Sequence, residues 1–500
     1  MLKFALPITL ILLLGIACSD IQELSDFENL ENSPQLALPL VNSSFQLQDA
    51  LENVDENADI LVDSDGLLRF YYQSDTTIRK SQEIFDVLNR TLPPLVPVFD
   101  TLIGFSVVNQ EGLGVNSVIF KEGRLEYSFF NSNASAIDIS VTVLQMFKDG
   151  QPLQQSHTLA ATSTLPTASF DLAGVELQPQ NDSLFIRYEA YDDNGERVKV
   201  DNFLLLQKEV DYSYASGVFT SSILENIPDT LAFDFTEQIE GDLYFEQPKV
   251  TITIGNSFGL PADLRFSQFD IVTKDGSILP LESEFIDNGF LFNFPDFDEV
   301  GETKQTVFTF DRNNSNLDQI IGAGPVGLVY ELDAITNPDE DTPGFITDES
   351  AFSYSIEAEF PLFGTIRDLK LRDTLDIDLS FESIGNVEEM EFKLITENEI
   401  PLGASVQAYF LSDTQLLDSL FIDGTQNIVQ AASVDSAGNS AKASTQTTFI
   451  SVDETRLNTI ETANKILIEA TFNTSADSEN SVRVEKDQTL AIRMGVKATL

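Results

Sequence analysis

Residues 136–147 read AIDISVTVLQMF, and apolar and polar side chains alternate along most of this stretch. Successive side chains of a β-strand point to opposite faces, so the alternation predicts a strand with one buried face. The stretch runs into Asp149-Gly150, a pair of residues that favours the tight turn of a β-hairpin. This pattern of an alternating strand followed by a tight turn decides the fold class.

The same pattern recurs along the chain. Short alternating runs rich in β-branched and aromatic residues predict further strands at 124–131, 183–191, 249–254, 306–310, 374–382 and 405–411. Hairpin turns are predicted at Asp65-Gly66, Asn194-Gly195 and Asp275-Gly276. Residues 488–500 alternate up to the last residue, which predicts a packed strand at the end of the sequence. We therefore expect an all-β protein built from tandem antiparallel β-sandwich domains of immunoglobulin-like type, with few short helices.

Two segments predict helices. Residues 80–94 form one candidate, which Pro93 would end. The second candidate spans 451–465, where Ser451 and Glu454 have the spacing of a capping box. This helix would place Leu457 and Ile460 on one face.

Three segments resemble one another, namely 125–153, 250–281 and 377–402. Each begins with a strand, continues through a short turn that often contains Asn, and then enters a longer alternating strand. Tandem sandwiches derived from one ancestral unit would give this pattern. Any all-β sequence also resembles itself, because alternation and turns recur, and the sequence leaves both explanations open.

The length and these patterns predict five parts. We expect a signal peptide at 1–17, an acidic flexible tether at 18–35, a β-rich N-terminal domain at 36–210, a middle β-sandwich at 211–365 and a C-terminal β-sandwich at 366–500.

The composition excludes several classes of function. Asp and Glu number 81 and Lys and Arg number 28, which gives a formal net charge of −53. Such a surface repels nucleic-acid phosphates and anionic lipids, so we expect neither nucleic-acid binding nor charge-driven membrane binding. The chain has one cysteine, Cys18, and one histidine, His157. Histidine- or cysteine-based metal centres therefore lack ligands, and we expect no cofactor.

The N-terminus has the layout of a secretory signal. Lys3 precedes an apolar run at 4–14, and the small residues Gly15 and Ala17 lead to Cys18. The apolar run is shorter than the roughly 20 residues that a membrane span needs.

Leu14-Gly15-Ile16-Ala17-Cys18 resembles the signal of bacterial lipoproteins, with the large aliphatic residue one position earlier than usual. With the acidic segment after Cys18 and residues 37–51, the chain resembles an uncharacterised class of β-rich surface or outer-membrane lipoproteins of Bacteroidota. The resemblance implies that Cys18 is acylated and becomes the first residue after cleavage. It also implies an outer-membrane lipoprotein, with the cell surface favoured over the periplasmic face. It implies no known activity.

One motif resembles a dinucleotide-binding fingerprint, Gly322-x-Gly324-x-x-Gly327. That site needs a buried strand before the glycines and a helix after them. Here a polar stretch precedes the motif and an alternating, strand-like stretch follows it. We therefore interpret it as a glycine-rich loop. His157 lacks a neighbouring acid or nucleophile signature, so a polar structural position is the favoured interpretation.

Oxygen-ligand calcium sites are a further candidate. Asp339, Glu340 and Asp341 form one acidic loop, and similar pairs occur at Asp63 with Asp65 and at Asp192 with Asp193. Calcium takes six to eight oxygen ligands, and tight turns require the same residue types, so turns are the favoured interpretation.

Asp-Ser/Thr triplets resemble the O-glycosylation sequon of Bacteroidota envelope proteins. They mark candidate glycan acceptors at Thr76, Thr101, Ser183, Thr230, Thr374, Ser419 and Ser436.

Three functions remain open at this stage. The favoured one is a non-enzymatic envelope lipoprotein that serves adhesion, scaffolding or binding of a protein or glycan partner. The alternatives are a glycan- or nutrient-binding accessory lipoprotein of an uptake system, and a hydrolase that uses a pair of carboxylates. The absence of tryptophan argues against a broad sugar-stacking surface.

Overall fold

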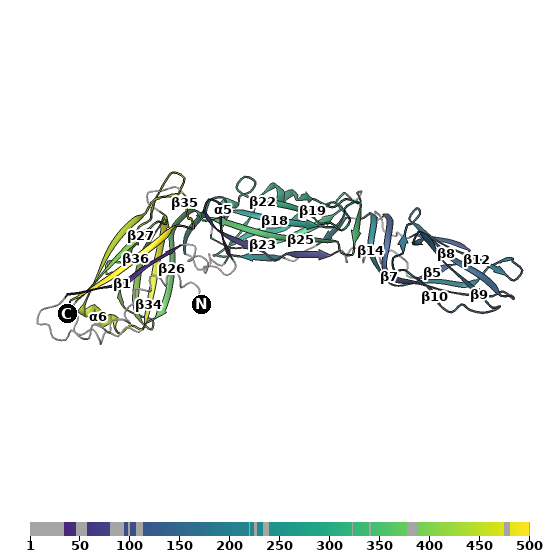
Figure 1. Cartoon of the computed structure of the whole chain (residues 1–500), viewed down its shortest axis with the longest axis horizontal. Coiled ribbons are helices and arrows are strands. Elements are labelled where there is room, and N and C mark those ends of the chain that lie inside the picture. Colours follow the sequence, from purple (N-terminus) through teal and green to yellow (C-terminus); the bar gives the residue numbers. More distant parts are fainter. Residues whose placement is uncertain are drawn as a thin grey trace.

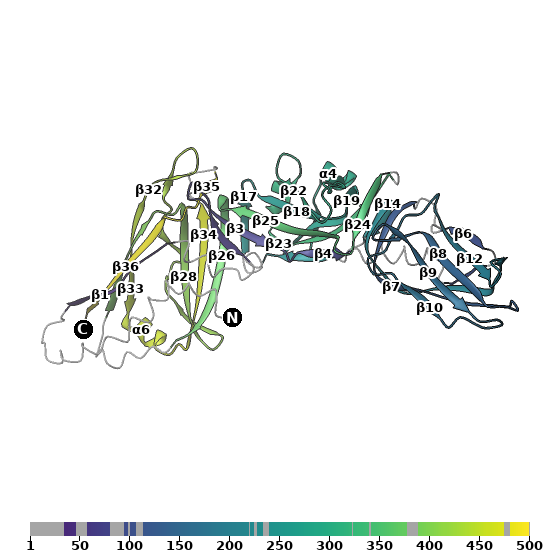
Figure 2. The same ribbon diagram turned by 45° about the vertical axis from the view of Figure 1, so that its right-hand side comes forward.

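The computed structural model of this chain shows three β-rich lobes in a row (Figure 1). It describes residues 35–46, 58–80, 95–98, 101–106, 114–219, 221–224, 228–233, 240–322, 324–339, 342–377, 389–474 and 481–499. We call the lobes distal (residues 95–218), middle (58–80, 221–233 and 249–361) and terminal (35–46, 240–245 and 363–499). The turned view in Figure 2 keeps the three lobes in the same row, so the molecule is elongated.

The distal lobe is built on one antiparallel sheet of eleven strands, in the order β13-β12-β8-β11-β7-β14-β24 with four further strands alongside. Its strands are β5 (Leu95–Val98), β6 (Leu102–Ser106), β7 (Gly114–Phe130), β8 (Ile137–Lys148), β9 (Gln151–Leu159), β10 (Ala168–Asp171), β11 (Glu176–Leu177), β12 (Ser183–Asp192), β13 (Arg197–Val198) and β14 (Asp201–Val218). The rings of Tyr188 on β12 and Phe203 on β14 lie 5.6 Å apart although several strands separate them in the sheet. The sheet therefore curls over its own core.

The middle lobe is a sandwich of two sheets, ordered β2-β3-β25-β18-β22 and β15-β23-β19-β20. Its strands are β2 (Asp59–Val62), β3 (Leu68–Gln73), β4 (Thr77–Lys80), β15 (Ser222–Leu224), β16 (Asp229–Ala232), β18 (Lys249–Asn256), β19 (Ala262–Thr273), β20 (Ile278–Pro280), β21 (Phe290–Phe292), β22 (Lys304–Phe310), β23 (Pro325–Thr336), β24 (Pro343–Thr347) and β25 (Ala351–Pro361). Rings from the two sheets meet in the core, with Phe269 and Phe310 5.4 Å apart. Strand β24 lies in the middle lobe by chain position but pairs with β14 of the distal lobe.

The terminal lobe is a second two-sheet sandwich, ordered β1-β36-β27-β33 and β17-β26-β34-β28-β29. Its strands are β1 (Gln35–Gln46), β17 (Glu240–Phe245), β26 (Phe363–Asp376), β27 (Glu389–Asn398), β28 (Leu402–Ser412), β29 (Gln415–Ser419), β30 (Gln426–Val429), β31 (Ser433–Val434), β32 (Ser440–Lys442), β33 (Ser444–Asp453), β34 (Lys465–Thr474), β35 (Val482–Arg483) and β36 (Thr489–Thr499). Leu394 from one sheet and Val406 from the other belong to the same buried cluster.

The alternation that predicted the strands matches their burial. In β8, Ile137, Ile139, Val141 and Val143 are buried, whereas Asp138 between the first two is exposed. Burying one such aliphatic side chain contributes roughly 1.5–3 kcal/mol, so a single strand supplies a substantial part of the core. The predicted all-β sandwich fold is confirmed.

The four predicted hairpin turns are confirmed. Gly66, Gly150, Gly195 and Gly276 follow their Asp or Asn partner with φ of 92°, 75°, 77° and 81°, the left-handed region that glycine adopts without strain. Each turn joins two strands that pair with each other.

The helix predictions were only partly right. Residues 81–94 of the first candidate lie outside the described residues, and Lys80 ends β4. The second candidate is shorter than expected, because α6 spans Glu454–Ile460 and Asp453 caps it by accepting the N–H of Arg456. The Ser451–Glu454 capping box was therefore wrong. Leu457 and Ile460 do face the core. Two further helices, α4 (Glu284–Asn288) and α5 (Leu317–Ile321), were not predicted.

One corner recurs in all three lobes. Asn131 follows β7, Asn256 ends β18 and Asn398 ends β27, and each is at most 1% exposed. In each corner the side-chain oxygen accepts the backbone N–H two residues on, at 3.0 Å. The side-chain amide then donates to backbone carbonyls of a neighbouring loop. A buried asparagine thus replaces missing backbone partners where the chain turns into its next long strand.

This corner defines the internal repeat more closely than the sequence does. The first two corners fall at the turns of the segments 125–153 and 250–281. In the terminal lobe the equivalent corner is Asn398, followed by β28 and a turn at Asp413 with φ of 54°. The corner at Asn398 lies near the end of the segment 377–402, whereas Asn131 and Asn256 lie near the start of theirs, so the third segment does not match the other two in register.

The sheets depart from the expected division at 36–210. Strand β1 pairs with β36 of the terminal lobe, and β3 pairs with β25 of the middle lobe. Strands from the start of the chain thus complete sheets formed mainly by later residues, since a strand can add its hydrogen bonds wherever a sheet edge is open. The expected boundary at 210 also falls inside β14.

Backbone hydrogen bonds cross both junctions between lobes. At the distal junction, β24 pairs with β14, and Phe345 exchanges backbone hydrogen bonds with Gly259 of the middle lobe at 2.9 and 3.1 Å. At the terminal junction, the N–H of Leu68 donates to the carbonyl of Val484 at 3.0 Å, and the N–H of Lys486 donates to the carbonyl of Gly66 at 3.0 Å. Backbone hydrogen bonds therefore join the lobes in addition to the chain itself.

Candidate functional site

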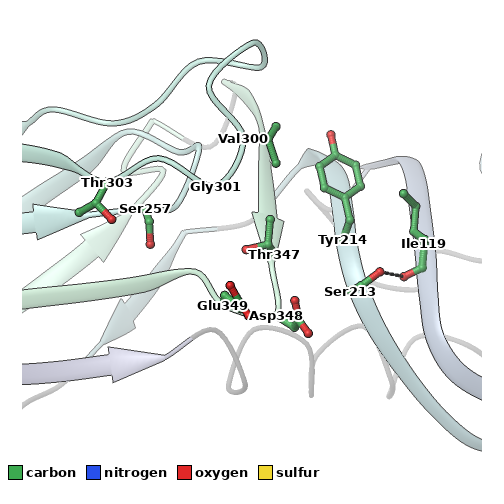
Figure 3. A pocket seen from close by; sticks show the side chains of 10 residues that line it. All are labelled: Ile119, Ser213, Tyr214, Ser257, Val300, Gly301, Thr303, Thr347, Asp348 and Glu349. Atoms are coloured by element: carbon green, nitrogen blue, oxygen red, sulfur yellow. Dashed lines mark hydrogen bonds between the residues drawn. The ribbon is translucent and has the colours of Figure 1, made fainter. Parts of the chain in front are cut away.

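A pocket of about 680 Å³ lies at the junction of the distal and middle lobes. Its lining residues are Ile119, Ser213, Tyr214, Ser257, Val300, Gly301, Thr303, Thr347, Asp348 and Glu349. Figure 3 shows that they come from β7 and β14 on one side and from middle-lobe loops and the end of β24 on the other. Volumes of 300–1,000 Å³ are typical of ligand sites.

Strand pairing brings these segments together. Tyr214 of β14 lies opposite Thr347, the last residue of β24. Asp348 and Glu349 follow directly and turn back toward β25, so they face the distal lobe from the middle one. The N–H of Asp348 donates to the carbonyl of Ser213 at 3.2 Å, which holds this turn against β14.

The hydroxyl groups in the pocket wall are mostly engaged with backbone atoms. Ser213 donates to the carbonyl of Ile119 at 3.3 Å, as Figure 3 shows, and Ser257 donates to the carbonyl of Ala351 at 3.2 Å. The hydroxyl of Thr347 lies 3.0 Å from that of Ser350. The Ser213 hydroxyl donates to Ile119 and accepts no hydrogen bond from the described residues, so its oxygen can accept one from a ligand.

The charge of the lining residues is negative. Asp348 accepts from Lys121 Nζ at 2.7 Å, and this hydrogen bond and the attraction of Asp348 raise the pKa of Lys121. The nearby carboxylates of Asp211 and Glu122 raise it further. Glu349 is exposed and forms no hydrogen bond or ion pair with the described residues. The pocket therefore contains two carboxylates, that of Asp348, which Lys121 neutralises, and that of Glu349, which has no partner among the described residues.

Aromatic side chains form the adjoining wall. The ring of Tyr214 stacks near that of buried Phe345, with centroids 6.1 Å apart and planes 18° apart. Phe297 contacts Phe345 from the other side at 5.7 Å and is 52% exposed. Val300, next along the same loop, is 45% exposed. The rim thus carries apolar surface next to the acidic residues.

The same loop holds a group of acids that the sequence reading missed. One carboxylate oxygen each from Asp296, Asp298 and Glu299 lie within 4.8 Å of one another. Glu299 is already engaged, because Lys304 Nζ donates to it at 2.6 Å and lowers its pKa. The sequence signal was the run Asp296-Phe297-Asp298-Glu299. This geometry could hold a cation, but exposed acids adopt it without one.

Most residues of the predicted calcium loop and of the predicted lipid anchor lie outside the part of the chain that the structure describes. Glu340, Asp341 and Cys18 lie outside the described residues, while Asp339 follows the end of β23. In the other candidates the acids serve turns. Asp192 accepts the N–H groups of Asn194 and Glu196, and Asp65 accepts that of Leu67. These bonds lower the pKa of Asp192 and of Asp65.

The candidate glycan acceptors are spread over all three lobes, and none lines the pocket. Four are exposed, namely Thr76, Thr230, Thr374 and Ser436. Three are half-buried, namely Thr101, Ser183 and Ser419.

The remaining two candidates have structural positions. The motif Gly322-x-Gly324-x-x-Gly327 follows α5 and enters β23, which reverses the strand-then-helix order that dinucleotide binding needs. His157 lies in β9, where its Nε2 is 2.6 Å from the hydroxyl of Tyr127, and burial lowers the pKa of His157.

The fold defines an all-β protein of antiparallel sandwiches. Within the described part of the chain, no helix is long and apolar enough to cross a membrane. No family model and no curated protein matches the sequence.

Solved structures show weak similarities. A predicted secreted protein from Parabacteroides distasonis aligns with 93% of this chain and 100% of its own, at 10% identity and a TM-score of 0.30. A structure of infectious bursal disease virus, Gt strain, aligns with 89% of this chain and 81% of its own, at 9% identity and a TM-score of 0.15. An Arthrobacter globiformis isomalto-dextranase in complex with panose covers 65% of this chain and 40% of its own, at 10% identity and a TM-score of 0.14. At TM-scores this low they define neither a family nor a function for this chain.

Proposed function

We propose that this chain is a lipid-anchored protein of the bacterial cell envelope that presents a row of β-lobes for partner binding, adhesion or scaffolding, without a catalytic step. The supporting observation is the register of β1, the first strand after Cys18 in the described part of the chain. Gln35, the first described residue, pairs with Thr499, and Gln46 at the other end of β1 pairs with Thr489.

This register sets the direction in which the anchor would lie. In Figure 1 the Gln35–Thr499 end of β1 points away from the middle lobe, and the distal lobe occupies the opposite end of the molecule. The segment that leads back to Cys18 would therefore leave from the end farthest from the distal lobe. Residues 19–34 could extend this connection by at most about 55 Å. Acylation of Cys18 would thus place the terminal lobe near the membrane and the distal lobe away from it.

The junctions support a presenting role. Pairing of β24 with β14 links the distal and middle lobes, and backbone hydrogen bonds from Leu68 to Val484 and from Lys486 to Gly66 link the middle and terminal lobes. Lobes joined in this way keep their order better than lobes joined only by a flexible linker.

The anchor is tested with Cys18→Ala in a Bacteroidota host. We expect the wild-type chain to incorporate an alkyne-labelled fatty acid and to fractionate with the outer membrane. The Cys18→Ala chain should do neither, because Cys18 is the sole cysteine. If the variant remains in the outer-membrane fraction after a salt wash, the anchor proposal fails.

Orientation is tested with single cysteines on intact cells. An acylated Cys18 does not react with maleimide, so the wild-type chain is the blank. Asp193→Cys places a thiol on an exposed turn of the distal lobe, and Gln415→Cys places one at the exposed start of β29 in the terminal lobe. We expect a bulky membrane-impermeant maleimide to label Asp193→Cys on intact cells. Labelling of neither site until the cells are lysed would contradict surface presentation.

A further inference from the structure

We propose that the pocket between the distal and middle lobes binds a cationic side chain, lysine or arginine, of a protein partner. This inference names the partner class for the proposed presenting function, but it concerns the pocket and does not require the lipid anchor. The pocket is lined by Tyr214, Asp348 and Glu349 among others, and the Val300–Thr303 loop forms part of its wall.

The charge of the pocket selects the class of ligand. Two of the lining residues, Asp348 and Glu349, are acidic and none is basic. Lys121 forms an ion pair with Asp348 at 2.7 Å. Glu122 and Asp211 act on the same lysine, so it is outnumbered by acids. An anionic ligand would meet net repulsion here, whereas a cation would be attracted and steered toward the site.

The individual groups fit an ammonium or guanidinium ion. Glu349 is exposed and forms no ion pair with the described residues, so its carboxylate can accept charge-assisted hydrogen bonds. The Ser213 oxygen is a further acceptor. The ring of Tyr214 lies in the wall beside them and offers an electron-rich aromatic face. The Glu349 carboxylate, the Ser213 oxygen and the Tyr214 ring all attract a hydrogen-bond donor that carries positive charge.

The rim favours a protein side chain over a small inorganic cation. Phe297 and Val300 are 52% and 45% exposed on the loop that borders the pocket. Lysine and arginine bury an apolar stem along such surface while their charged heads reach polar groups. A pocket of about 680 Å³ is also larger than one side chain needs, and it can admit flanking residues of a partner segment.

The test measures binding of fluorescein-labelled hexalysine to the full-length protein in detergent by fluorescence anisotropy, at about 150 mM NaCl. Glu349→Gln should weaken binding roughly tenfold, since a hydrogen bond to a charged group is lost. Tyr214→Leu should weaken it about threefold, and Tyr214→Phe should leave it unchanged because the ring remains. Labelled hexaglutamate should not bind.

The matched control is Glu284→Gln. Glu284 is an exposed acid in α4 of the middle lobe, so this variant changes the net charge equally without touching the pocket. If Glu349→Gln and Glu284→Gln weaken hexalysine binding equally, the attraction is spread over the acidic surface and the proposal is overturned. The proposal would also be overturned in favour of a glycan site by a second result. In that case the protein would bind neutral maltohexaose, and Tyr214→Leu would abolish this binding but leave hexalysine binding unchanged. Neither result bears on membrane fractionation of Cys18→Ala, so this inference and the anchor fail separately.

Discussion

At the scale of single residues, the buried asparagines Asn131, Asn256 and Asn398 have the clearest physical task. Each supplies side-chain hydrogen bonds at a point where the chain leaves one strand and enters a loop. Asn398 does this most fully, since its amide lies within 3.0 Å of the carbonyls of Ile400, Leu402 and Gln430. An unsatisfied buried carbonyl is costly, so these positions accept few replacements.

Asn398→Ala should therefore destabilise the terminal lobe by about 2–4 kcal/mol, because three carbonyls and one N–H lose their partner. Urea denaturation followed by circular dichroism measures this, since the chain has no tryptophan. Asn427→Ala is the matched control, as Asn427 is exposed in β30 of the same lobe. Equal unfolding midpoints for the two variants would contradict the role assigned to Asn398.

Asp435 makes the stability of one hairpin depend on pH. Hydrogen bonds from the Asn439 side chain and from the N–H groups of Asn439 and Ala437 hold the pKa of Asp435 below its ordinary value. Because the pKa of Asp435 is lower in the folded than in the unfolded state, its carboxylate stabilises the fold fully above the unfolded-state pKa. This stabilisation is lost as the pH falls through the folded-state pKa.

The wild-type chain should thus be more stable than Asp435→Asn at pH 7, and the difference should shrink toward zero as the pH falls below about 3.8. Urea midpoints at pH 7, 5 and 3.5 measure it, with Asp423→Asn on an exposed loop of the same lobe as the control. A difference that stays constant from pH 7 to 3.5 would show that the carboxylate charge is not involved.

At the scale of elements, strands were predictable and their partners were not. The strand at 137–148 follows from local alternation, and so does β36 at the end of the sequence. β1 pairs with β36, which lies more than 400 residues away in the chain. No local sequence pattern predicts this pairing, because an open sheet edge accepts any strand of suitable length. The short α4 and α5 were missed for a related reason, since five residues are too few to show a helical period.

Deleting residues 35–46 should loosen β36 selectively. The deletion removes the pairing from Gln35–Thr499 to Gln46–Thr489 and turns β36 into an edge strand. Hydrogen–deuterium exchange at 489–499 should then become at least tenfold faster, while exchange at β18 in the middle lobe should stay unchanged. Equal acceleration in both strands would mean that the lobes do not unfold independently.

At the scale of the whole molecule, the row of lobes is the feature on which the proposed function depends. A compact protein of this length has a radius of gyration of about 23 Å. Small-angle X-ray scattering should give a clearly larger value, because the lobes lie in a row and do not cluster (Figure 1). A value near 23 Å would contradict the elongated arrangement and the presenting role.

The candidate site belongs to this largest scale. Its residues come from β7, β14, the loop before β22 and the end of β24, which the sequence separates by more than 200 positions. Asp348 and Glu349 carried no motif, and the acidic run at 296–299 was one among many in a chain with 81 acids. Only the pairing of β24 with β14 places them beside Tyr214.

The sequence by itself determined the all-β class, the tight hairpin turns and the strongly negative surface, because these depend on neighbouring residues and on composition. The tertiary structure alone decided which strands complete which sheet, where the recurring asparagine corner falls in the terminal lobe, and which acids share a pocket. These features arise from hydrogen bonds and packing between distant segments, and local pattern carries no information about which distant segments meet.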